Sequence, residues 1–208
     1  MKIKIFEKGP INANNYLVID EKTNDAVLID CSSAEDSYIE EIKSTGVNLK
    51  YILLTHGHFD HLLGVDKFHE VFGVDTYVAQ EDMTQVRLVP DMMQMFAGML
   101  PVNISSIHHY VKDGDEFRVG NLIIKAISTP GHTEGGMCYL VGDTLFSGDT
   151  MFQGSVGRCD LTGGSWDAIK DSIKNKLFKL PENTVVYPGH GPKTTIDFEK
   201  KYNEIINL

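Results

Sequence analysis

The sequence predicts an α+β fold in which two β-sheets pack face to face and helices cover their outer faces. Segments with strand periodicity and segments with helical periodicity follow one another in the same order in each half of the chain. Several of the predicted strands end in a glycine-containing turn that carries a histidine or an aspartate. The 208 residues, 42% of them hydrophobic, suffice for one domain over residues 1–208 with a sizeable core.

The first half of the chain alternates strands and helices. Period-two or continuous apolar runs predict strands at Lys2 to Glu7, Asn15 to Ile19, Ala26 to Asp30, Tyr51 to Leu54 and Thr76 to Val78. Apolar residues at helical spacing predict one helix from about Ala34 to Thr45 and another from His61 to Phe72. Gly46 and Gly73 are the expected ends of these helices.

Residues 80–108 differ from the rest of the chain in composition. Five of the eight methionines fall here, namely Met83, Met92, Met93, Met95 and Met99. Pro90 and Pro101 interrupt the segment and predict two short helices. Because methionine adapts to varied apolar partners, the segment is interpreted as an insertion that forms a lid or a pocket wall. Core filling and a contact between copies of the chain are the alternatives, so a homo-oligomer stays open. His108 and His109 are not predicted to bind a metal, since no other ligand-type residue accompanies them.

The second half returns to strands. Two hairpins are predicted, one from Glu116 to Ile127 and one from Gly136 to Ser147. A helix from about Ser165 to Phe178 is expected to bury Trp166, Ile169, Ile173 and Leu177. Thr184 to Tyr187 is predicted as a strand, and Thr195 to Ile206 as the last helix.

The composition limits the partners and the location of the protein. A formal net charge of -10 argues against binding to nucleic acid or to an anionic membrane surface, since both require positive patches. No stretch approaches the roughly 20 apolar residues of a membrane span, and the N-terminus lacks the features of a secretory signal. Cys31, Cys138 and Cys159 have no paired spacing and are interpreted as reduced thiols. The expectation is a cytoplasmic protein with a small-molecule substrate.

The most informative stretch is Thr55-His56-Gly57-His58-Phe59-Asp60-His61. Four side chains that bind metals through nitrogen or oxygen fall within six residues, after a strand and before a helix. His56 and His58 can project to one side, while Asp60 and His61 point to a neighbouring volume. One loop can therefore serve two metal sites. A histidine-rich surface turn is the alternative, but such turns seldom follow a buried strand.

Three further turns each present one ligand-type residue after a predicted strand. They are Thr129-Pro130-Gly131-His132-Thr133, Ser147-Gly148-Asp149-Thr150 and Tyr187-Pro188-Gly189-His190-Gly191. Glycine and proline let the backbone turn sharply, so that each ligand can point into a shared cleft. Each turn alone is a weak signal, but together with the histidine-rich loop they predict a metal site.

The ordered set of ligand-type residues resembles that of the metallo-β-lactamase fold superfamily over nearly the whole chain. This resemblance implies a four-layer αββα sandwich with the site at one edge. It further implies that a first metal is held by His56, His58 and His132, and that a second is held by Asp60, His61 and His190, with Asp149 bridging the two. Two divalent ions are expected, with zinc as the first choice and iron or manganese as the alternatives.

Within the superfamily, the chain is most similar to the glyoxalase II group, the hydroxyacylglutathione hydrolases, and to their short single-domain relatives. The stretches Ser147 to Phe152 and Gly157 to Ser165 carry this likeness. Arg158 falls where those enzymes place a basic residue that helps to bind substrate, but Asp160 stands in place of a tyrosine contact. Typical members also have an added helical domain that grips glutathione, whereas 18 residues follow His190 here. The resemblance therefore implies a thioester more strongly than it implies glutathione.

The expected reaction is hydrolysis of a thioester, of S-lactoylglutathione type or of another low-molecular-weight thiol. Two ions about 3.5 to 4 Å apart can share a water whose pKa falls to roughly 7, and the bridging hydroxide would attack the carbonyl carbon. Asp60 and Asp149 are the predicted catalytic carboxylates, because they offset part of the metal charge. A thiolate leaves without a dedicated general acid.

Other functions stay open. A mononuclear iron persulfide dioxygenase would need only His56, His58 and His132, and a lactone or other ester hydrolase would use the same pair of ions. A metal-stabilised binding module without turnover represents a different class. Asp30, at its own strand end, either orients a ligand through a hydrogen bond or serves as a structural cap. Cys159 is interpreted as a bystander thiol.

Overall fold

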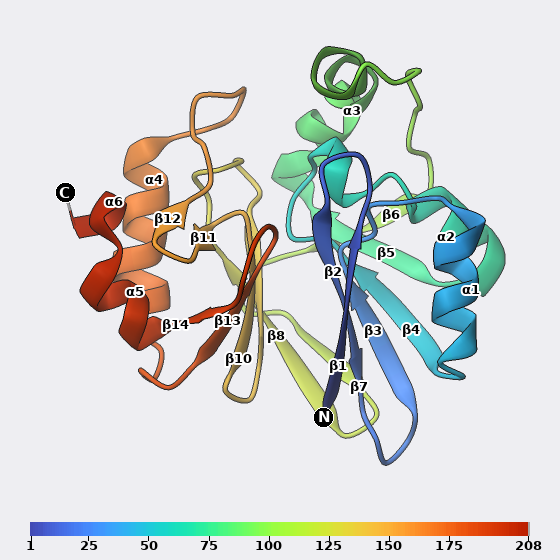
Figure 1. Cartoon of the computed structure of the whole chain (residues 1–208), viewed down its shortest axis with the longest axis horizontal. Coiled ribbons are helices and arrows are strands. Elements are labelled where there is room, and N and C mark those ends of the chain that lie inside the picture. The colour runs from blue at the N-terminus through green and yellow to red at the C-terminus, as the bar shows by residue number, and fades with distance from the viewer. Residues whose placement is uncertain (208) are drawn as a thin grey trace.

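Two six-stranded β-sheets form the centre of the structure. The computed structural model describes residues 1–207, and Figure 1 shows the sheets side by side with helices on their outer faces. The first sheet has the order β1 (Lys2–Lys8), β2 (Ala13–Ile19), β3 (Asp25–Ile29), β4 (Asn48–Leu53), β5 (Asp75–Ala79), β6 (Ile107–Val111). The second has the order β14 (Thr194–Thr195), β13 (Val185–Pro188), β10 (Thr144–Gly148), β9 (Met137–Val141), β8 (Leu122–Ser128), β7 (Glu116–Val119). A separate small hairpin pairs β11 (Met151–Phe152) with β12 (Ser155–Val156).

The pairing directions place the ends of six strands at one edge of the molecule. In the first sheet, β3, β4 and β5 are parallel neighbours, so the loops that follow them emerge on the same side. In the second sheet, β8 and β9 are antiparallel, as are β9 and β10, while β10 and β13 are parallel. The carboxyl ends of β8, β10 and β13 therefore also share one side. Every predicted ligand follows one of these strands.

The strands alternate between two apolar layers. On β9 and β10, Tyr139 and Phe146 pack between the sheets, whereas Cys138 and Leu145 face the outer helices. The inner layer also includes Tyr16 from the first sheet. Both hairpins predicted for the second half are confirmed as β7–β8 and β9–β10.

Helices cover the outer face of each sheet. The first sheet is covered by α1 (Asp36–Ser44) and α2 (Val65–Phe72), whose apolar residues Tyr38, Ile42 and Phe68 are buried against it. The second is covered by α4 (Trp166–Asp171), its continuation through Lys179, α5 (Ile196–Tyr202) and α6 (Glu204–Asn207) (Figure 1). The predicted four-layer αββα sandwich is confirmed. None of the helices in residues 1–207 has the length and apolar content that a membrane crossing requires.

The methionine-rich segment differs from the prediction of two short helices. A single helix, α3 (Met83–Met92), passes through Pro90 and continues as a π-helical turn over Met93–Ala97. Pro90 lacks the N–H that would donate to the Val86 carbonyl one turn earlier, and it lies only two residues before the end of this helix. The segment then leads into β6, a strand that periodicity did not indicate and that contains His108 and His109.

Two other helix predictions need correction. The helix expected from His61 begins only at Val65, because Phe59–His61 forms a separate 3-10 turn that is held by the loop before it. Trp166 was expected to be buried, but it is 41% exposed. It lies in the first turn of α4, and the ammonium of Lys170 lies 5.5 Å from its ring centroid. Ile169, one turn further on, faces the sheet as predicted.

Candidate metal centre

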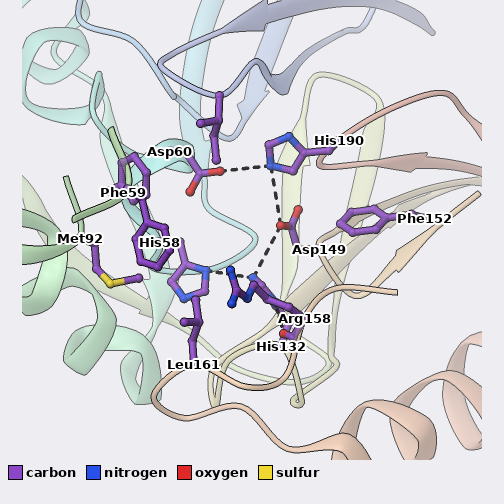
Figure 2. Close-up of a pocket in the computed structure, with 12 residues that line it drawn as sticks. His58, Phe59, Asp60, Met92, His132, Asp149, Phe152, Arg158, Leu161 and His190 are labelled. Atoms are coloured by element: carbon purple, nitrogen blue, oxygen red, sulfur yellow. Dashed lines mark hydrogen bonds and ion pairs between the residues drawn. The ribbon is translucent and has the colours of Figure 1, made fainter. Parts of the chain in front are cut away.

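All seven predicted ligand-type residues meet at the edge where the strands end. The histidine-rich loop lies between β4 and α2 and provides four of them, His56, His58, Asp60 and His61, all buried. The other three follow β8, β10 and β13 and are His132, Asp149 and His190. Figure 2 shows side chains from both sheets converging on one pocket.

Three imidazoles form the first group of this centre. One nitrogen from each of His56, His58 and His132 lies within 4.8 Å of the others. His58 Nδ1 and His132 Nε2 face each other at 2.9 Å, and the ring of His56 lies 4.8 Å from each of their rings between centroids. The alternation of His56 and His58 in the loop directs both rings to one side, as predicted. We call these three residues the imidazole group.

A second group combines one carboxylate with two imidazoles and consists of Asp60, His61 and His190. Their ligand atoms also lie within 4.8 Å of one another. His190 Nε2 is 3.1 Å from Asp60 Oδ2 and 3.3 Å from His61 Nε2. The side chain of His190 is 27% exposed, whereas His61 is fully buried. We call these residues the mixed group.

Asp149 lies between the two groups. Its Oδ1 atom is 3.5 Å from His61 Nε2, and its Oδ2 atom is 3.6 Å from His132 Nε2 and 3.7 Å from His190 Nε2. Its ligand atoms also form a third set with His56 and His61 within 4.8 Å. A carboxylate in this position can serve a cation in either group.

Several buried polar atoms of the centre have no hydrogen-bond partner. They are His56 Nε2, His58 Nε2 and Asp149 Oδ1. A buried polar atom without a partner is costly, and native structures rarely leave several together. Imidazole nitrogens and carboxylate oxygens are the donors that zinc, iron and manganese accept. The donor set therefore fits metal ions in both groups.

Two rings of the imidazole group, His56 and His58, are kept neutral by their surroundings. Burial lowers the pKa of His58 to about 3, and the adjacent His132 ring acts in the same direction. Burial, together with the neighbouring imidazoles, also holds the pKa of His56 well below its ordinary value. Neutral imidazole is the form that binds metals, so these two rings are prepared for a cation at neutral pH.

The mixed group has the opposite electrostatic character. Burial acts to lower the pKa of His61, but the carboxylates of Asp60, Asp149 and Asp30 outweigh it and raise this pKa well above its ordinary value. Burial also opposes ionisation of Asp60, yet the charge of His61 and a hydrogen bond with His190 hold the pKa of Asp60 below its usual range. The negative field that favours a proton here also favours a metal cation.

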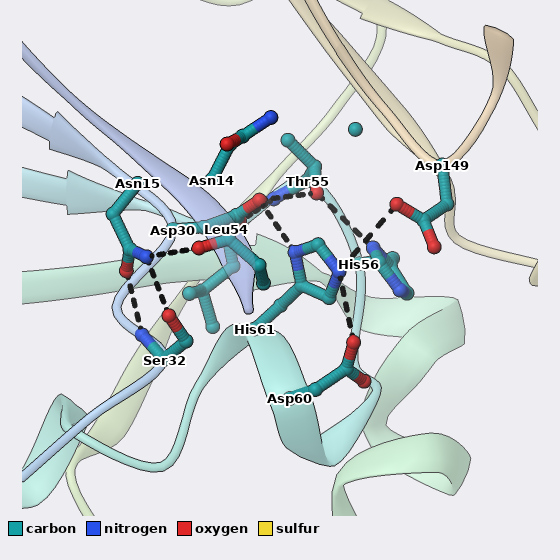
Figure 3. A network of polar contacts seen from close by, with 12 residues as sticks. Asn14, Asn15, Asp30, Ser32, Leu54, Thr55, His56, Asp60, His61 and Asp149 are labelled. Atoms are coloured by element: carbon teal, nitrogen blue, oxygen red, sulfur yellow. Dashed lines mark hydrogen bonds and ion pairs between the residues drawn. The ribbon is translucent and has the colours of Figure 1, made fainter. Parts of the chain in front are cut away.

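Asp30 connects the mixed group to the sheet. It follows β3 with a left-handed backbone, φ 60°, and is 1% exposed. Its carboxylate accepts hydrogen bonds from the backbone N–H and the hydroxyl of Thr55 and lies 2.8 Å from His61 Nδ1 (Figure 3). Of the two roles considered for Asp30, the structure supports the one in which it orients His61.

Asp82 is a residue that the sequence did not indicate. It follows β5, is fully buried, and accepts hydrogen bonds from the Gly57 N–H at 2.7 Å and the Gly135 N–H at 2.6 Å. The Thr133 hydroxyl donates a third at 2.8 Å. One carboxylate thus joins the loop of His56 and His58 to the loop of His132. Its position four residues after the predicted strand Thr76 to Val78 was the available signal.

Arg158 contributes through its backbone as well as its side chain. Its carbonyl oxygen lies 2.7 Å from His132 Nδ1 and so orients that ring. The guanidinium donates two hydrogen bonds to Asp160, at 2.8 and 2.9 Å, and lies 5.8 Å from the ring centroid of Phe96. The predicted substrate-binding charge therefore lies at the pocket but already has an anionic partner.

The pocket in front of the two groups has a volume of ≈ 420 Å³. Met92 and Phe96 of the methionine-rich segment contribute to its wall, whereas Met93 is buried in the core and Met95 is 73% exposed. The segment therefore combines a pocket wall with core filling.

His108 and His109 belong to none of the groups of candidate ligands found within residues 1–207. Cys159 is partly buried, and all three cysteines are free.

The fold and the cluster of histidines and aspartates are those of a metallo-hydrolase. A family model described as the metallo-beta-lactamase superfamily matches residues 9–190, and the chain belongs to this superfamily. A probable metallo-hydrolase, YqgX of Bacillus subtilis, is 35% identical over 100% of this chain and 98% of its own length. The hydroxyacylglutathione hydrolase GloC of Haemophilus influenzae is 31% identical over 100% of this chain and 99% of its own.

Solved structures show the same fold. The crystal structure of the B3 metallo-beta-lactamase BLEG-1 superposes with a TM-score of 0.91 at 31% identity, covering 100% of both chains. A di-iron-bound form of TTHA1623 gives 0.86 at 31% identity, covering 96% of this chain and 98% of its own. ETHE1 from Myxococcus xanthus gives 0.81 at 29% identity, covering 98% and 83%.

Proposed function

We propose that the protein is a hydrolase that uses two metal ions to cleave a thioester of a low-molecular-weight thiol. The observation that carries this proposal is the position of Asp149 between two ligand groups, with its Oδ1 atom buried and without a hydrogen-bond partner. A site for one ion would not require the second group or a carboxylate shared between them. The full-length similarity to GloC, named as a hydroxyacylglutathione hydrolase, supports the thioester. The di-iron form of TTHA1623 supports two ions.

The candidate ligands divide into one set for each ion and one carboxylate that serves both. One ion would be held by His56, His58 and His132, the other by Asp60, His61 and His190, and Asp149 would contact both. When bound, such ions lower the pKa of a water molecule and polarise a carbonyl oxygen.

The carboxylates and the loops that carry the ligands have separate tasks. Asp60 and Asp149 offset part of the added positive charge. Asp30 holds the His61 ring, and Asp82 holds the two loops of the imidazole group in register. A thiolate departs without a proton, so the chain needs no general acid at the leaving group.

A mononuclear iron dioxygenase acting on a persulfide is the second candidate. It is favoured by one observation, namely that the imidazole group is complete without any residue of the mixed group. In that case Asp60, Asp149 and His190 would orient or shield the iron ligands instead of binding a second ion.

Metal content per chain separates these two functions. The protein would be purified without chelator from cells supplied with zinc, iron or manganese, and each preparation analysed by plasma mass spectrometry. About two ions per chain, with hydrolysis of S-lactoylglutathione or another thioester, is the expected result. About one iron per chain with oxygen uptake on a persulfide would overturn the proposal. A lactone and a β-lactam belong in the same panel, because BLEG-1 is described as a metallo-beta-lactamase.

A further inference from the structure

We infer that the preferred substrates carry an apolar acyl group several carbons long, in place of a small hydroxyacyl group. This inference rests on the proposed thioester hydrolysis and concerns the same pocket. It comes from the side chains that form the walls, from the charges that those walls lack, and from the apolar surface that continues at the mouth.

Half of the residues that line the pocket are apolar. They are Ile11, Phe59, Met92, Phe96, Phe152 and Leu161. They come from segments far apart in the sequence, so the apolar character is a property of the assembled pocket and not of one loop. Figure 2 shows Phe59 and Met92 beside His58, and Phe152 on the opposite side near His190. An acyl group attached to the reacting carbonyl would therefore contact apolar side chains whichever side it occupied.

The walls lack the groups that a hydroxyacyl substrate would require. Apart from the candidate metal ligands and Arg158, no polar or charged side chain is among the described residues that line the pocket. A hydroxyl group on the acyl chain would lose its hydrogen bonds to water without gaining a partner from the apolar side chains of these walls. A methylene group in the same place would gain from leaving water.

Arg158 is the one arginine or lysine among the described residues that line the pocket, and it is already paired. Arg158 donates two hydrogen bonds to Asp160, and its guanidinium faces the Phe96 ring. A carrier with several anionic groups would have to compete with Asp160 for this one charge. The pocket therefore selects its substrate through apolar contact more than through ion pairing.

The apolar surface also extends beyond the pocket. Ile11 and Phe96 line it and are nevertheless 46% and 42% exposed. A short acyl group would leave these side chains in water, whereas a longer chain would cover them. The volume of ≈ 420 Å³ lies within the range of about 300 to 1,000 Å³ that is typical of small-molecule sites.

A series of thioesters on one neutral carrier tests this inference. N-acetylcysteamine thioesters of acetyl, lactoyl, butyryl, hexanoyl and octanoyl groups would be compared by kcat/KM with the metal-loaded protein. We expect kcat/KM to rise roughly two- to fourfold per added methylene until the pocket is filled. The lactoyl ester should be a poorer substrate than the butyryl ester.

Variants connect the chain-length preference to the wall. Met92→Ala and Leu161→Ala should each lower the ratio of octanoyl to acetyl kcat/KM roughly fivefold, because each removes apolar contact from the wall. Met95→Ala is the matched control, since Met95 belongs to the same helical segment but is 73% exposed and does not line the pocket. Thermal unfolding of each variant checks the fold. Inhibition by octanoate relative to acetate measures binding without turnover, and it should weaken in the two wall variants only.

The outcomes distinguish the inference from the function on which it rests. If the metal-loaded protein hydrolyses no thioester of any length, the proposed function is wrong and the inference falls with it. If thioesters are hydrolysed but the octanoyl ester is no better than the acetyl ester, or the lactoyl ester exceeds the butyryl ester, only the inference is overturned. The role assigned to these walls would also be overturned if kcat/KM rose with chain length but the octanoyl-to-acetyl ratio stayed unchanged in both wall variants.

Discussion

The two ligand groups of the centre differ in charge although they share one loop. The imidazole group consists of three rings, two of which, His56 and His58, have a pKa lowered by burial. The mixed group contains Asp60 and lies beside Asp30 and Asp149, and the pKa of His61 is raised. Neighbouring sites a few ångströms apart thus have opposite responses to protons.

This difference shows how a short sequence can build two unlike groups of candidate metal ligands. His56 and His58 in the first part of the loop meet the histidine that follows β8, whereas Asp60 and His61 in its second part meet the histidine that follows β13. Neutral ligands leave a bound cation strongly electrophilic, whereas carboxylates hold it through charge. The experiments below test this contrast, beginning with the largest expected effect.

Replacing Asp149 with asparagine should remove the negative charge that the imidazole group and the mixed group share. The neutral amide removes the negative charge next to His61, His132 and His190. We expect the metal content to fall to about one ion per chain or less, and hydrolysis to fall by at least roughly a hundredfold. Asp143→Asn, an exposed aspartate in the turn between β9 and β10, is the control for loss of one negative charge. Two retained ions with full activity in Asp149→Asn would contradict the bridging position.

Adding one methyl group at Gly189 should damage the mixed group more than the imidazole group. A Cβ at this position would collide with Asp149 Oδ1 and would lie 2.8 Å from His61 Cε1. We expect loss of one ion per chain while the imidazole group keeps its own, as measured by metal analysis. Gly191→Ala serves as the control, because its Cβ meets nothing within 4 Å and it reports only the backbone cost of φ +76°, about 1 kcal/mol. Equal metal content in both variants would show that the mixed group does not require a glycine at position 189.

Asp82→Asn should act on the imidazole group instead. An amide cannot accept from both the Gly57 and Gly135 N–H groups with its two ends, so one buried donor loses its partner. The expected cost is about 1 to 3 kcal/mol of unfolding free energy. Metal affinity should also weaken roughly 10- to 100-fold, as measured by competition with a chelator. Glu81→Gln, an exposed neighbour, should change neither quantity.

The smallest effects are expected in the pH dependence of the metal-free protein. The lowered pKa of His58, about 3, means that its contribution to stability is complete above roughly pH 6.5 and is lost as the pH falls toward 3. The raised pKa of His61 means the reverse, since its contribution is complete below roughly pH 6.5 and is lost as the pH rises through the raised value. The free energy of unfolding, measured with urea between about pH 3 and 9, should therefore decrease toward both the acid and the alkaline end of this range. His58→Gln should reduce the loss of stability at acid pH, and His61→Gln should reduce the loss at alkaline pH. The reverse result would contradict the difference in charge between the two groups.

Much of the architecture was predictable because its signals are local. Alternation along β8 and β9, the continuous apolar run before Thr55 and the glycines in the turns depend only on neighbouring residues. The same holds for the histidine-rich loop, in which side-chain chemistry and spacing indicate metal binding without further information. Pro90 and Trp166 misled the prediction, because the helix runs through Pro90 close to its end and Trp166 lies exposed beside Lys170.

The sequence by itself determined which residues could bind metals and the order in which strands and helices present them. Tertiary structure decided how those residues are charged and held, because burial and proximity arise from segments far apart in the chain. Asp82 joins loops 25 and 53 residues away, and the Arg158 carbonyl orients a ring 26 residues away. The apolar wall is likewise assembled from distant segments. No local pattern contains such contacts, since they form only when both sheets are packed.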